Sequence, residues 1–262
     1  MKNVLITGSA SGIGKALCKV YHLNGYKVYG VDIKEVDSKE ITPFKADITN
    51  EEALKNVYEK LKSNKIILDM IINVAGIHKM ASLVETDYTL MKKVIDVNLS
   101  GTMLVNKTFH PLLNKNGKIV ILTSEVASFD PLPFNGLYNV SKTALDTYAQ
   151  ALRQELNLIG QKVITIRPGA IKTELSNNSL LDTERLANET QLYKKQSNKF
   201  LHFVKKFTGK PMEPESLAKY IFNITLKKNP RYIYKKHQNF GLVLLSILPK
   251  RLQCFVIKTL LK

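Results

Sequence analysis

The N-terminal stretch of the chain constrains the fold most strongly. Residues 2–7 (Lys-Asn-Val-Leu-Ile-Thr) form an apolar run without polar alternation, the pattern of a parallel strand buried on both faces. A turn with Gly8, Gly12 and Gly14 follows at once, and apolar residues then recur at helical spacing. In this order, the turn's backbone amides and the helix N-terminus can approach a phosphate group closely. We therefore expect an α/β fold that binds a nucleotide.

The next strand pattern ends in an acid. Residues 26–32 (Tyr-Lys-Val-Tyr-Gly-Val-Asp) predict a second strand that finishes at Asp32. In a dinucleotide site an acid here accepts hydrogen bonds from both ribose hydroxyls and repels a 2′-phosphate. Asp32 therefore favours NAD as the cofactor over NADP. The alternative interpretation is an aspartate that only caps a loop or a helix.

A tyrosine and a lysine four residues apart form the second informative pattern. The chain contains the spacing Tyr-x-x-x-Lys four times, starting at residues 58, 88, 138 and 232, so the spacing alone indicates little. Tyr138 differs in context, because the strand pattern of residues 118–123 and then Ser124 precede it and a helix with an apolar face follows. On that helix the ammonium of Lys142 would lie beside the phenol and lower its pKa. We predict that Tyr138 is a general acid.

Between residue 2 and about residue 175 the chain resembles the short-chain dehydrogenase/reductase family. The spacing Thr7-Gly8-x-x-x-Gly12-x-Gly14 has the form that this family uses, and residues 73–76 (Asn-Val-Ala-Gly) are similar to its Asn-Asn-Ala-Gly element, with valine as the second residue. Residues 47–48 fit its adenine contact and residues 168–173 its nicotinamide loop. The resemblance implies cofactor contacts from Gly8, Ser11, Gly12, Ile13, Gly14, Asp32, Asp47, Ile48, Asn73, Ala75, Gly76, Tyr138, Lys142, Pro168, Gly169, Ile171 and Thr173.

The same resemblance implies a catalytic group of Asn98, Ser124, Tyr138 and Lys142. Tyr138 would exchange a proton with the substrate oxygen while a hydride moves to or from the nicotinamide. Ser124 would hydrogen-bond that oxygen, and Lys142 would hold the nicotinamide ribose. Asn98 would anchor a water molecule that passes protons from Lys142 to solvent.

Strand and helix patterns alternate from residue 2 to residue 234 of the 262, with no linker, internal repeat or low-complexity block. Such alternation predicts one Rossmann-type domain, a doubly wound parallel sheet with helices on both faces. We assign residues 1–235 to a dinucleotide-binding and catalytic domain. Residues 236–262 form a basic amphipathic C-terminal extension.

The two cysteines, Cys18 and Cys254, have no metal-binding spacing, and we expect neither a disulfide nor a metal site. Because the first strand begins at residue 2, we expect no leader segment and a cytoplasmic protein, peripheral on a membrane if the extension binds one.

Positive charge gathers in the last third of the chain. The formal net charge is +17, and residues 194–262 carry 16 lysines and arginines against two glutamates. We find no nucleic-acid-binding module with this charge, so we expect no nucleic-acid partner. Residues 240–248 are apolar but too few for a bilayer span of about 20 residues. Residues 250–262 place an apolar face between basic residues, as interfacial membrane helices do. A helix that covers the active site or forms a subunit interface fits equally well.

Residues 174–211 correspond to the family's mobile lid. The approach to Tyr138, residues 131–137, resembles the steroid and retinoid branch of the family, and together with the apolar residues of the lid it suggests a bulky apolar alcohol or ketone. The resemblance implies an NAD-dependent oxidoreductase that interconverts a secondary alcohol and a ketone on a lipophilic, steroid-like substrate, as a homo-oligomer, either dimer or tetramer. Two alternatives stay open: a 3-oxoacyl thioester reductase, and a non-catalytic nucleotide-binding scaffold at a membrane surface. The intact catalytic group argues against the scaffold.

Overall fold

The structure is a computed structural model that describes residues 1–207 and 210–262, without the side chains of residues 206 and 207. Within these residues a seven-stranded sheet has the strand order β3-β2-β1-β4-β5-β6-β7. The strands are β1 (Lys2–Thr7), β2 (Tyr26–Asp32), β3 (Thr42–Lys45), β4 (Leu68–Asn73), β5 (Leu113–Leu122), β6 (Lys162–Pro168) and β7 (Ile233–Lys236).

Every neighbouring strand pair in this sheet is parallel. From β1 the chain first adds strands on one side, β2 and β3, and then crosses back to add β4 to β7 on the other. The order therefore reverses between β1 and β4, and ligands of such sheets bind at the carboxyl ends of the strands at this reversal. The predicted doubly wound parallel sheet is confirmed.

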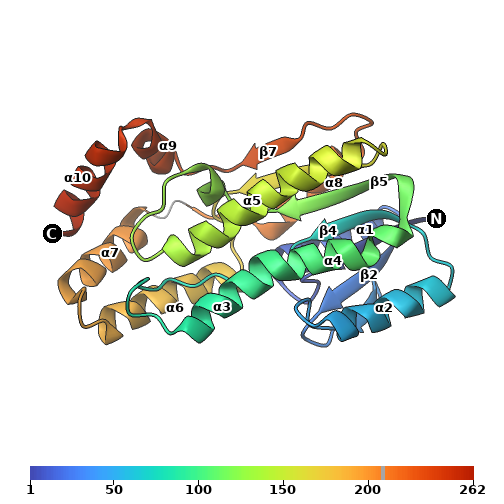
Figure 1. Ribbon diagram of the computed structural model, residues 1–262, viewed down its shortest axis with the longest axis horizontal. Coiled ribbons are helices and arrows are strands. Elements are labelled where there is room, and N and C mark those ends of the chain that lie inside the picture. Colours follow the sequence, from blue (N-terminus) through green and yellow to red (C-terminus); the bar gives the residue numbers. More distant parts are fainter. Residues whose placement is uncertain (208–209) are drawn as a thin grey trace.

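Helices cover both faces of the sheet (Figure 1). On one face α1 (Gly12–Leu23) and α8 (Pro214–Thr225) pack against the strands. On the other face lie α2 (Glu51–Ser63), α4 (Thr102–Phe109) and α5 (Gly136–Asn157). Side chains of a strand alternate between faces, so Val4 and Ile6 of β1 join the first layer and Leu5 joins the second. All three are fully buried, which explains why the strand sequence lacks polar alternation.

Short helical segments carry the chain between these layers and the strand ends. α3 (Tyr88–Ile95) continues through a π-helical turn, η1 (Asp96–Gly101), into α4. Two 3-10 turns, η2 (His110–Leu112) and η3 (Glu125–Ser128), flank β5. The π-helical turn lies in the middle of an otherwise regular helical run, a position where such turns often accompany a functional residue.

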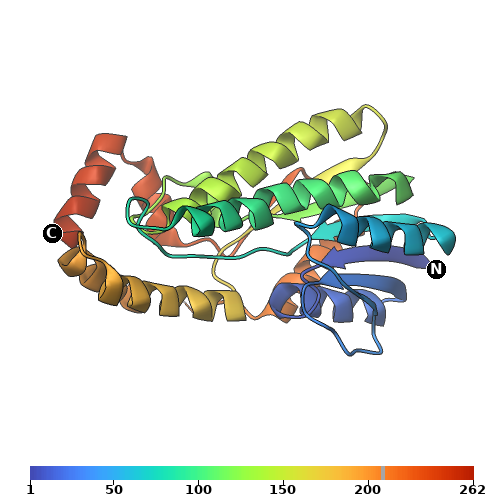
Figure 2. The same ribbon diagram turned by 60° about the horizontal axis from the view of Figure 1, so that its bottom comes forward.

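Four helices lie beyond the carboxyl ends of the strands, at the end of the molecule opposite the N-terminus (Figure 2). They are α6 (Glu174–Glu189), α7 (Lys194–Phe207), α9 (Phe240–Ile247) and α10 (Lys250–Leu261), and together they are called the cap. α10 packs against α7, and Leu261 is buried in a cluster with Met80, Phe134 and Phe200. The expected lid corresponds to α6 and α7, although its residues 208 and 209 lie outside the described residues. None of the helices in the described ranges is long and apolar enough to cross a membrane.

Candidate active site

The glycine-rich turn between β1 and α1 has a backbone that other residues could hardly adopt. Gly8 and Gly12 have φ angles of +72° and +50°, in the region that glycine populates at little steric cost. A Cβ atom on Gly14 would lie 1.9 Å from the carbonyl oxygen of Gly8. Ser11 caps α1 through its extended backbone, and Ile13 is the second residue of the helix. The turn therefore offers bare backbone amides at a helix N-terminus, a shape that accepts a pyrophosphate.

Asp32 lies beside this turn. Its carboxylate accepts a hydrogen bond from the backbone N–H of Ala10 at 2.9 Å and another from the backbone N–H of Lys34 at 2.9 Å. The Lys34 ammonium lies 3.3 Å from Glu174 in an exposed ion pair. The acid at the end of β2 is thus held against the turn, where the ribose of a nucleotide bound there would lie.

The segment after β4 runs alongside the same turn. The Thr7 hydroxyl accepts hydrogen bonds from the backbone N–H groups of Val74 and Ala75, at 3.1 and 3.2 Å. A Cβ atom on Gly8 would lie 3.0 Å from the Ala75 nitrogen. The buried Asn73 side chain donates to Asn106 of α4 at 2.9 Å. Residues 73–76 therefore form a wall of the nucleotide site, and the Asn73 side chain ties this wall to the helix layer.

Asp47 and Ile48 lie between β3 and α2. Asp47 accepts hydrogen bonds from the backbone and the hydroxyl of Thr49, both at 2.8 Å. Ile48 is buried and packs so closely on Gly101 that a Cβ atom there would lie 2.9 Å from it. The predicted adenine contact thus lies next to the π-helical turn that carries Asn98.

Asn98 is fully buried in η1 and makes three hydrogen bonds. Its amide oxygen accepts from the Ile77 backbone N–H at 2.8 Å, and its amide nitrogen donates to the Ile77 carbonyl at 2.9 Å. The same nitrogen donates to the Ser141 hydroxyl at 2.9 Å. Asn98 therefore joins the segment after β4 to α5, between Tyr138 and Lys142.

Ser124, Tyr138 and Lys142 come together at the end of β5. The Lys142 ammonium donates to the Leu122 carbonyl at 3.3 Å and lies 5.8 Å from the centre of the Tyr138 ring. Ser124 lies close enough to the Tyr138 hydroxyl to lower the pKa of the phenol. A Cβ atom on Gly76 would lie 3.0 Å from the Asn98 oxygen and 3.4 Å from the Lys142 nitrogen. The four predicted catalytic residues thus form one group around Gly76.

Burial controls the proton affinities in this group. It raises the pKa of Tyr138 to about 12, against a lowering by the hydrogen bond from Ser124, and the charge of Glu125 raises it further. Burial also lowers the pKa of Lys142 to about 8. The expectation that Lys142 lowers the pKa of Tyr138 is therefore wrong for this structure. The ammonium lies against the ring and donates to a backbone carbonyl, and the burial of the phenol sets the direction of the shift.

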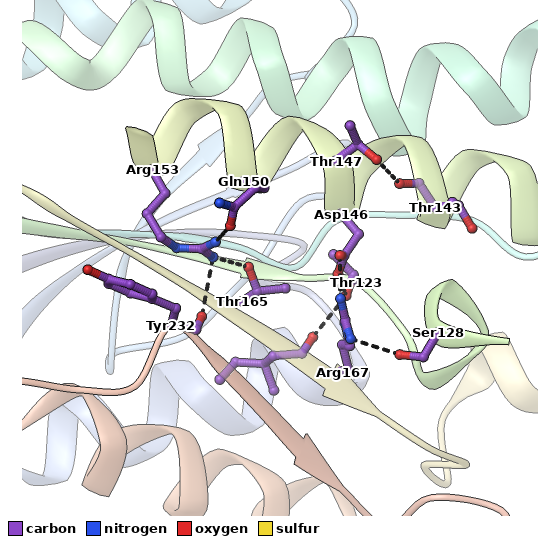
Figure 3. Close-up of polar contacts among 11 residues, drawn as sticks. Thr123, Ser128, Thr143, Asp146, Thr147, Gln150, Arg153, Thr165, Arg167 and Tyr232 are labelled. Carbon is purple, nitrogen blue, oxygen red and sulfur yellow. Dashed lines mark hydrogen bonds and ion pairs between the residues drawn. The ribbon is translucent and has the colours of Figure 1, made fainter. Parts of the chain in front are cut away.

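Polar contacts fasten α5, the helix of Tyr138 and Lys142, to the sheet (Figure 3). Arg167 of β6 donates to both carboxylate oxygens of Asp146, at 2.9 and 2.5 Å. The almost fully buried Arg153 donates to the Val163 carbonyl at 3.0 Å and to the Thr165 hydroxyl at 2.7 Å. Charged groups this deep are tolerated only when their hydrogen bonds are satisfied. These contacts therefore fix the position of the helix relative to β6.

The loop after β6 closes the site. A Cβ atom on Gly169 would lie 1.8 Å from the His237 carbonyl oxygen, so only glycine fits there, directly after Pro168. Ile171 is buried and pairs with Met212, and Thr173 caps α6 through a capping box. The Thr173 side chain is the nearest neighbour of Gly12. The predicted nicotinamide loop thus spans from the catalytic group to the glycine turn.

Sequence reasoning missed three residues of this site. Ser141 holds Asn98, as described above. The buried Glu125 accepts from the backbone N–H of Asn239 at 2.6 Å and so ties the catalytic strand end to the start of α9. His78 packs its ring against Tyr138, with ring centres 4.2 Å apart. An acid next to Ser124 was a usable signal for Glu125, whereas a single histidine in a loop offers none.

The comparisons with known proteins agree with this geometry. The model of the short chain dehydrogenase family matches residues 2–184. An NADPH-dependent 1-acyldihydroxyacetone phosphate reductase from Schizosaccharomyces pombe is 35% identical over 73% of this chain and 68% of its own length. A 3-ketodihydrosphingosine reductase from Bacteroides thetaiotaomicron is 26% identical over 87% and 85%. The crystal structure of a short chain dehydrogenase family protein from Francisella tularensis has a TM-score of 0.75 at 25% identity and covers 90% of this chain and 96% of its own.

The family match, the relatives and the fold all identify the chain as an enzyme of one family. The predicted alternative of a non-catalytic scaffold is therefore wrong. The chain belongs to the short-chain dehydrogenase family, whose members are oxidoreductases that act on CH–OH groups with a nicotinamide cofactor.

Proposed function

We propose that this protein interconverts a secondary alcohol and a ketone on a lipophilic substrate, with NAD as its cofactor. The observation that carries the proposal is the grouping of Asn98, Ser124, Tyr138 and Lys142 at the strand ends beside a glycine turn. The names of the two relatives support a lipid ketone as the substrate class.

The residues present fit a dinucleotide. Positive φ angles at Gly8 and Gly12 and the close contact at Gly14 make a cradle that a side chain would fill. The turn would hold the pyrophosphate, Asp32 the adenosine ribose, and Asp47 with Ile48 the adenine. Lys142 and the loop of residues 168–173 would hold the nicotinamide end. When bound, the nicotinamide supplies or accepts the hydride.

The chain's own groups then handle the proton. In the reducing direction Tyr138, protonated at neutral pH because burial raises its pKa to about 12, donates its hydroxyl proton to the substrate oxygen. Ser124 hydrogen-bonds the same oxygen and orients it. Lys142, whose pKa burial lowers to about 8, can restore the proton near neutral pH. Asn98 holds the backbone of Ile77 and, in this proposal, a water molecule that links Lys142 to solvent.

Asp32 supports NAD over NADP, because its carboxylate would repel a 2′-phosphate. The 35% identical relative is NADPH-dependent, so the proposal needs a direct test. We expect a higher kcat/KM with NAD than with NADP for the purified protein. A higher value with NADP would contradict the role given to Asp32.

In this proposal the substrate lies between the strand ends and the cap. The buried cluster of Met80, Phe134, Phe200 and Leu261 gives it an apolar interior next to the helix of Tyr138. A steroid alcohol, a long-chain lipid ketone and a 3-oxoacyl thioester are the candidate substrates. We expect NADH oxidation with lipid ketones or steroid ketones, and a panel of the three classes, assayed at equal concentration, decides among them. Turnover of the thioester alone would favour the alternative reductase.

The cap also supports a contact with an anionic membrane surface. Phe240 and Ile247 of α9 and Phe255 of α10 are 72%, 73% and 64% exposed, and none of the eight residues of α9, all of them described, is buried. Arg251 and Lys258 are exposed on α10, whereas Lys250 lies 3.2 Å from Asp130. Exposed apolar residues with basic neighbours are the pattern of interfacial helices.

Vesicle flotation tests this contact. We expect binding to vesicles that contain phosphatidylserine, weaker binding at high salt, and no binding to purely zwitterionic vesicles. Replacing Phe240, Ile247 and Phe255 together by glutamine should abolish the binding to vesicles. The protein should still fold, because these exposed positions do not support the core. Leu158→Gln, at an 86% exposed position on α5's C-terminal side, is the matched control. Absence of vesicle binding by the wild-type protein at low salt would contradict the proposal. Light scattering on the same protein samples measures the number of subunits.

A further inference from the structure

The loop after β4 carries a histidine that lies against the proposed proton donor. The rings of His78 and Tyr138 meet edge to face, with their centres 4.2 Å apart and their planes at 78°. Two residues earlier in the loop, Gly76 lies next to Lys142 and Asn98. Any substrate whose carbonyl oxygen reaches Tyr138 therefore has its neighbouring atoms close to His78.

The hydrogen bonding of His78 determines which ring nitrogen is free. Its Nε2 lies 2.9 Å from the side-chain oxygen of Asn135, and an amide oxygen can only accept, so Nε2 carries the proton. Burial lowers the pKa of His78 to about 4; the hydrogen bond to Asn135 and the charge of Asp182 raise it, and Lys142 and Lys79 lower it. The ring is thus neutral at pH 7, and its Nδ1 holds a lone pair that can accept a hydrogen bond.

A second acceptor lies nearby on the cap. Asp182 of α6 receives one ion pair, from Lys79 at 2.9 Å to its Oδ1. Its Oδ2 and the Nδ1 of His78 are both enclosed, and neither has a hydrogen-bond partner among the described residues. Buried acceptors without donors are rare, because each one loses its hydration without compensation. One of them, on His78, lies against Tyr138, and the other, on Asp182, acts on His78 through its charge; together they indicate a donor that arrives with the substrate.

We propose that His78 Nδ1 and Asp182 Oδ2 form a subsite for a hydrogen-bond donor on the substrate, a hydroxyl or an ammonium group one or two carbon atoms from the reacting carbonyl. The short distance follows from the ring contact of 4.2 Å between His78 and Tyr138. The inference rests on the proposed function and deepens it, because it selects one class of lipid ketone. The substrate of this site is a ketone with a polar head next to its carbonyl.

The subsite joins the loop after β4 to helix α6. His78 belongs to the loop that Ala81 ties to Phe134 through a backbone hydrogen bond of 2.7 Å. Asp182 belongs to α6, which the rest of the loop contacts through Lys79. A donor held between the two would therefore contact both elements, so that the loop and α6 recognise the polar head together.

Matched ketones test the proposal on the full-length protein. The probes are dodecan-2-one, 1-hydroxydodecan-2-one and 1-aminododecan-2-one, which share the chain and the carbonyl and differ only in the donor. We expect wild type to prefer a donor-bearing ketone over dodecan-2-one by at least about tenfold in kcat/KM, because a site built around buried polar groups rejects the analogue that lacks the partner. Equal kcat/KM values for all three ketones would overturn the proposal while leaving the proposed function intact.

Variants of His78 assign the effect to this residue. His78→Phe keeps a ring edge against Tyr138 but removes the acceptor, so the ratio of kcat/KM for a donor-bearing ketone to that for dodecan-2-one should fall to about one. His78→Asn keeps an acceptor close to the Nδ1 position and should retain part of the preference. An unchanged preference in His78→Phe would refute the role of Nδ1. Circular dichroism and thermal melting establish that each variant folds.

Asp182→Asn distinguishes the two donors. If the subsite binds an ammonium group, loss of the negative charge should lower kcat/KM for the amino ketone more than for the hydroxy ketone. If it binds a hydroxyl group, kcat/KM should fall equally for both ketones. An unchanged value for both ketones would show that Asp182 takes no part.

Binding provides a readout that does not require turnover. We expect 1,2-dodecanediol to raise the melting temperature of the wild-type protein more than 2-dodecanol does, and the difference should vanish in His78→Phe. If no ketone reacts, the proposed function fails, and this comparison of the two alcohols still decides for or against the subsite. Equal shifts from both alcohols would overturn it.

Discussion

In the sheet, two large clusters of buried apolar side chains fill the space between the strands and the helices on either face. The cap shares one small cluster with four buried members among the described residues. A few polar contacts supplement it, such as the hydrogen bonds from Thr190 and the backbone of Leu192 to Glu85. The groups proposed to perform the chemistry thus lie on the part with the larger clusters, and the cap, where we propose that the substrate binds, is held by fewer contacts and can open locally.

Two phenylalanines test this difference directly. Phe109 of α4 is 0% exposed in the sheet layer, and Phe200 of α7 is 2% exposed in the cap. We expect Phe109→Ala to lower the free energy of unfolding by about 3–5 kcal/mol, the usual loss for such a truncation in a core. Phe200→Ala should lower it by about 1 kcal/mol or less, because the cap can loosen while the sheet stays folded.

Urea denaturation measures both free energies of unfolding, and steady-state kinetics measures the effect of each substitution on KM and kcat. Phe200→Ala should raise KM for a lipid ketone with little change in kcat. Equal destabilisation by the two substitutions would show that cap and sheet unfold as one unit.

Tyr138→Phe probes the rigid part. We expect kcat to fall by about 100-fold or more with the affinity for NAD unchanged, because only the proton donor is lost. Tyr58→Phe is the matched control, since Lys62 lies 5.5 Å from the centre of the Tyr58 ring, much as Lys142 lies 5.8 Å from that of Tyr138. Turnover measurements on both variants decide, and similar activity in the two would refute the assignment.

Asp32→Ala changes the cofactor end of the same strand edge. We expect the ratio of kcat/KM for NAD to that for NADP to fall about tenfold, because the variant no longer repels a 2′-phosphate. Asp37→Ala, an exposed acid in the following loop, should leave the ratio unchanged. A ratio that moves equally in both variants would mean that general charge, and not the position of Asp32, sets the preference.

Glu125→Gln gives the smallest expected effect, a shift in pH dependence. The charge of Glu125 raises the pKa of Tyr138, so its removal lowers that pKa. Alcohol oxidation needs the phenolate, so the rise of its rate with increasing pH should begin at a lower pH in the variant than in wild type. Ketone reduction needs the phenol, so the fall of its rate with increasing pH should also begin at a lower pH in the variant than in wild type. The pH profiles of kcat in both directions measure the shift, and a move to higher pH would contradict the role of Glu125.

Local patterns in the sequence were sufficient for the sheet and most of the site. The glycine spacing, the acid of β2 and the serine after β5 could be identified because strand ends, positive φ angles and helix starts depend on a few neighbouring residues. The apolar run of residues 240–248 and the amphipathic pattern of residues 250–262 correspond to two separate helices, α9 and α10. These patterns could not decide whether the C-terminal extension packs on the expected lid, and the packing of Leu261 of α10 against Phe200 of α7 places it there.

The sequence by itself determined the order of strands and helices and the glycine turn, and it predicted the four residues that we propose as catalytic, since each depends on short-range geometry. Only the tertiary structure brought His78 to Asp182 and Tyr138, and Glu125 to Asn239. These contacts join residues up to 114 positions apart, and no periodicity in the chain encodes them. The pKa of Tyr138 also depends on burial, which follows from how the layers and the cap pack around the phenol.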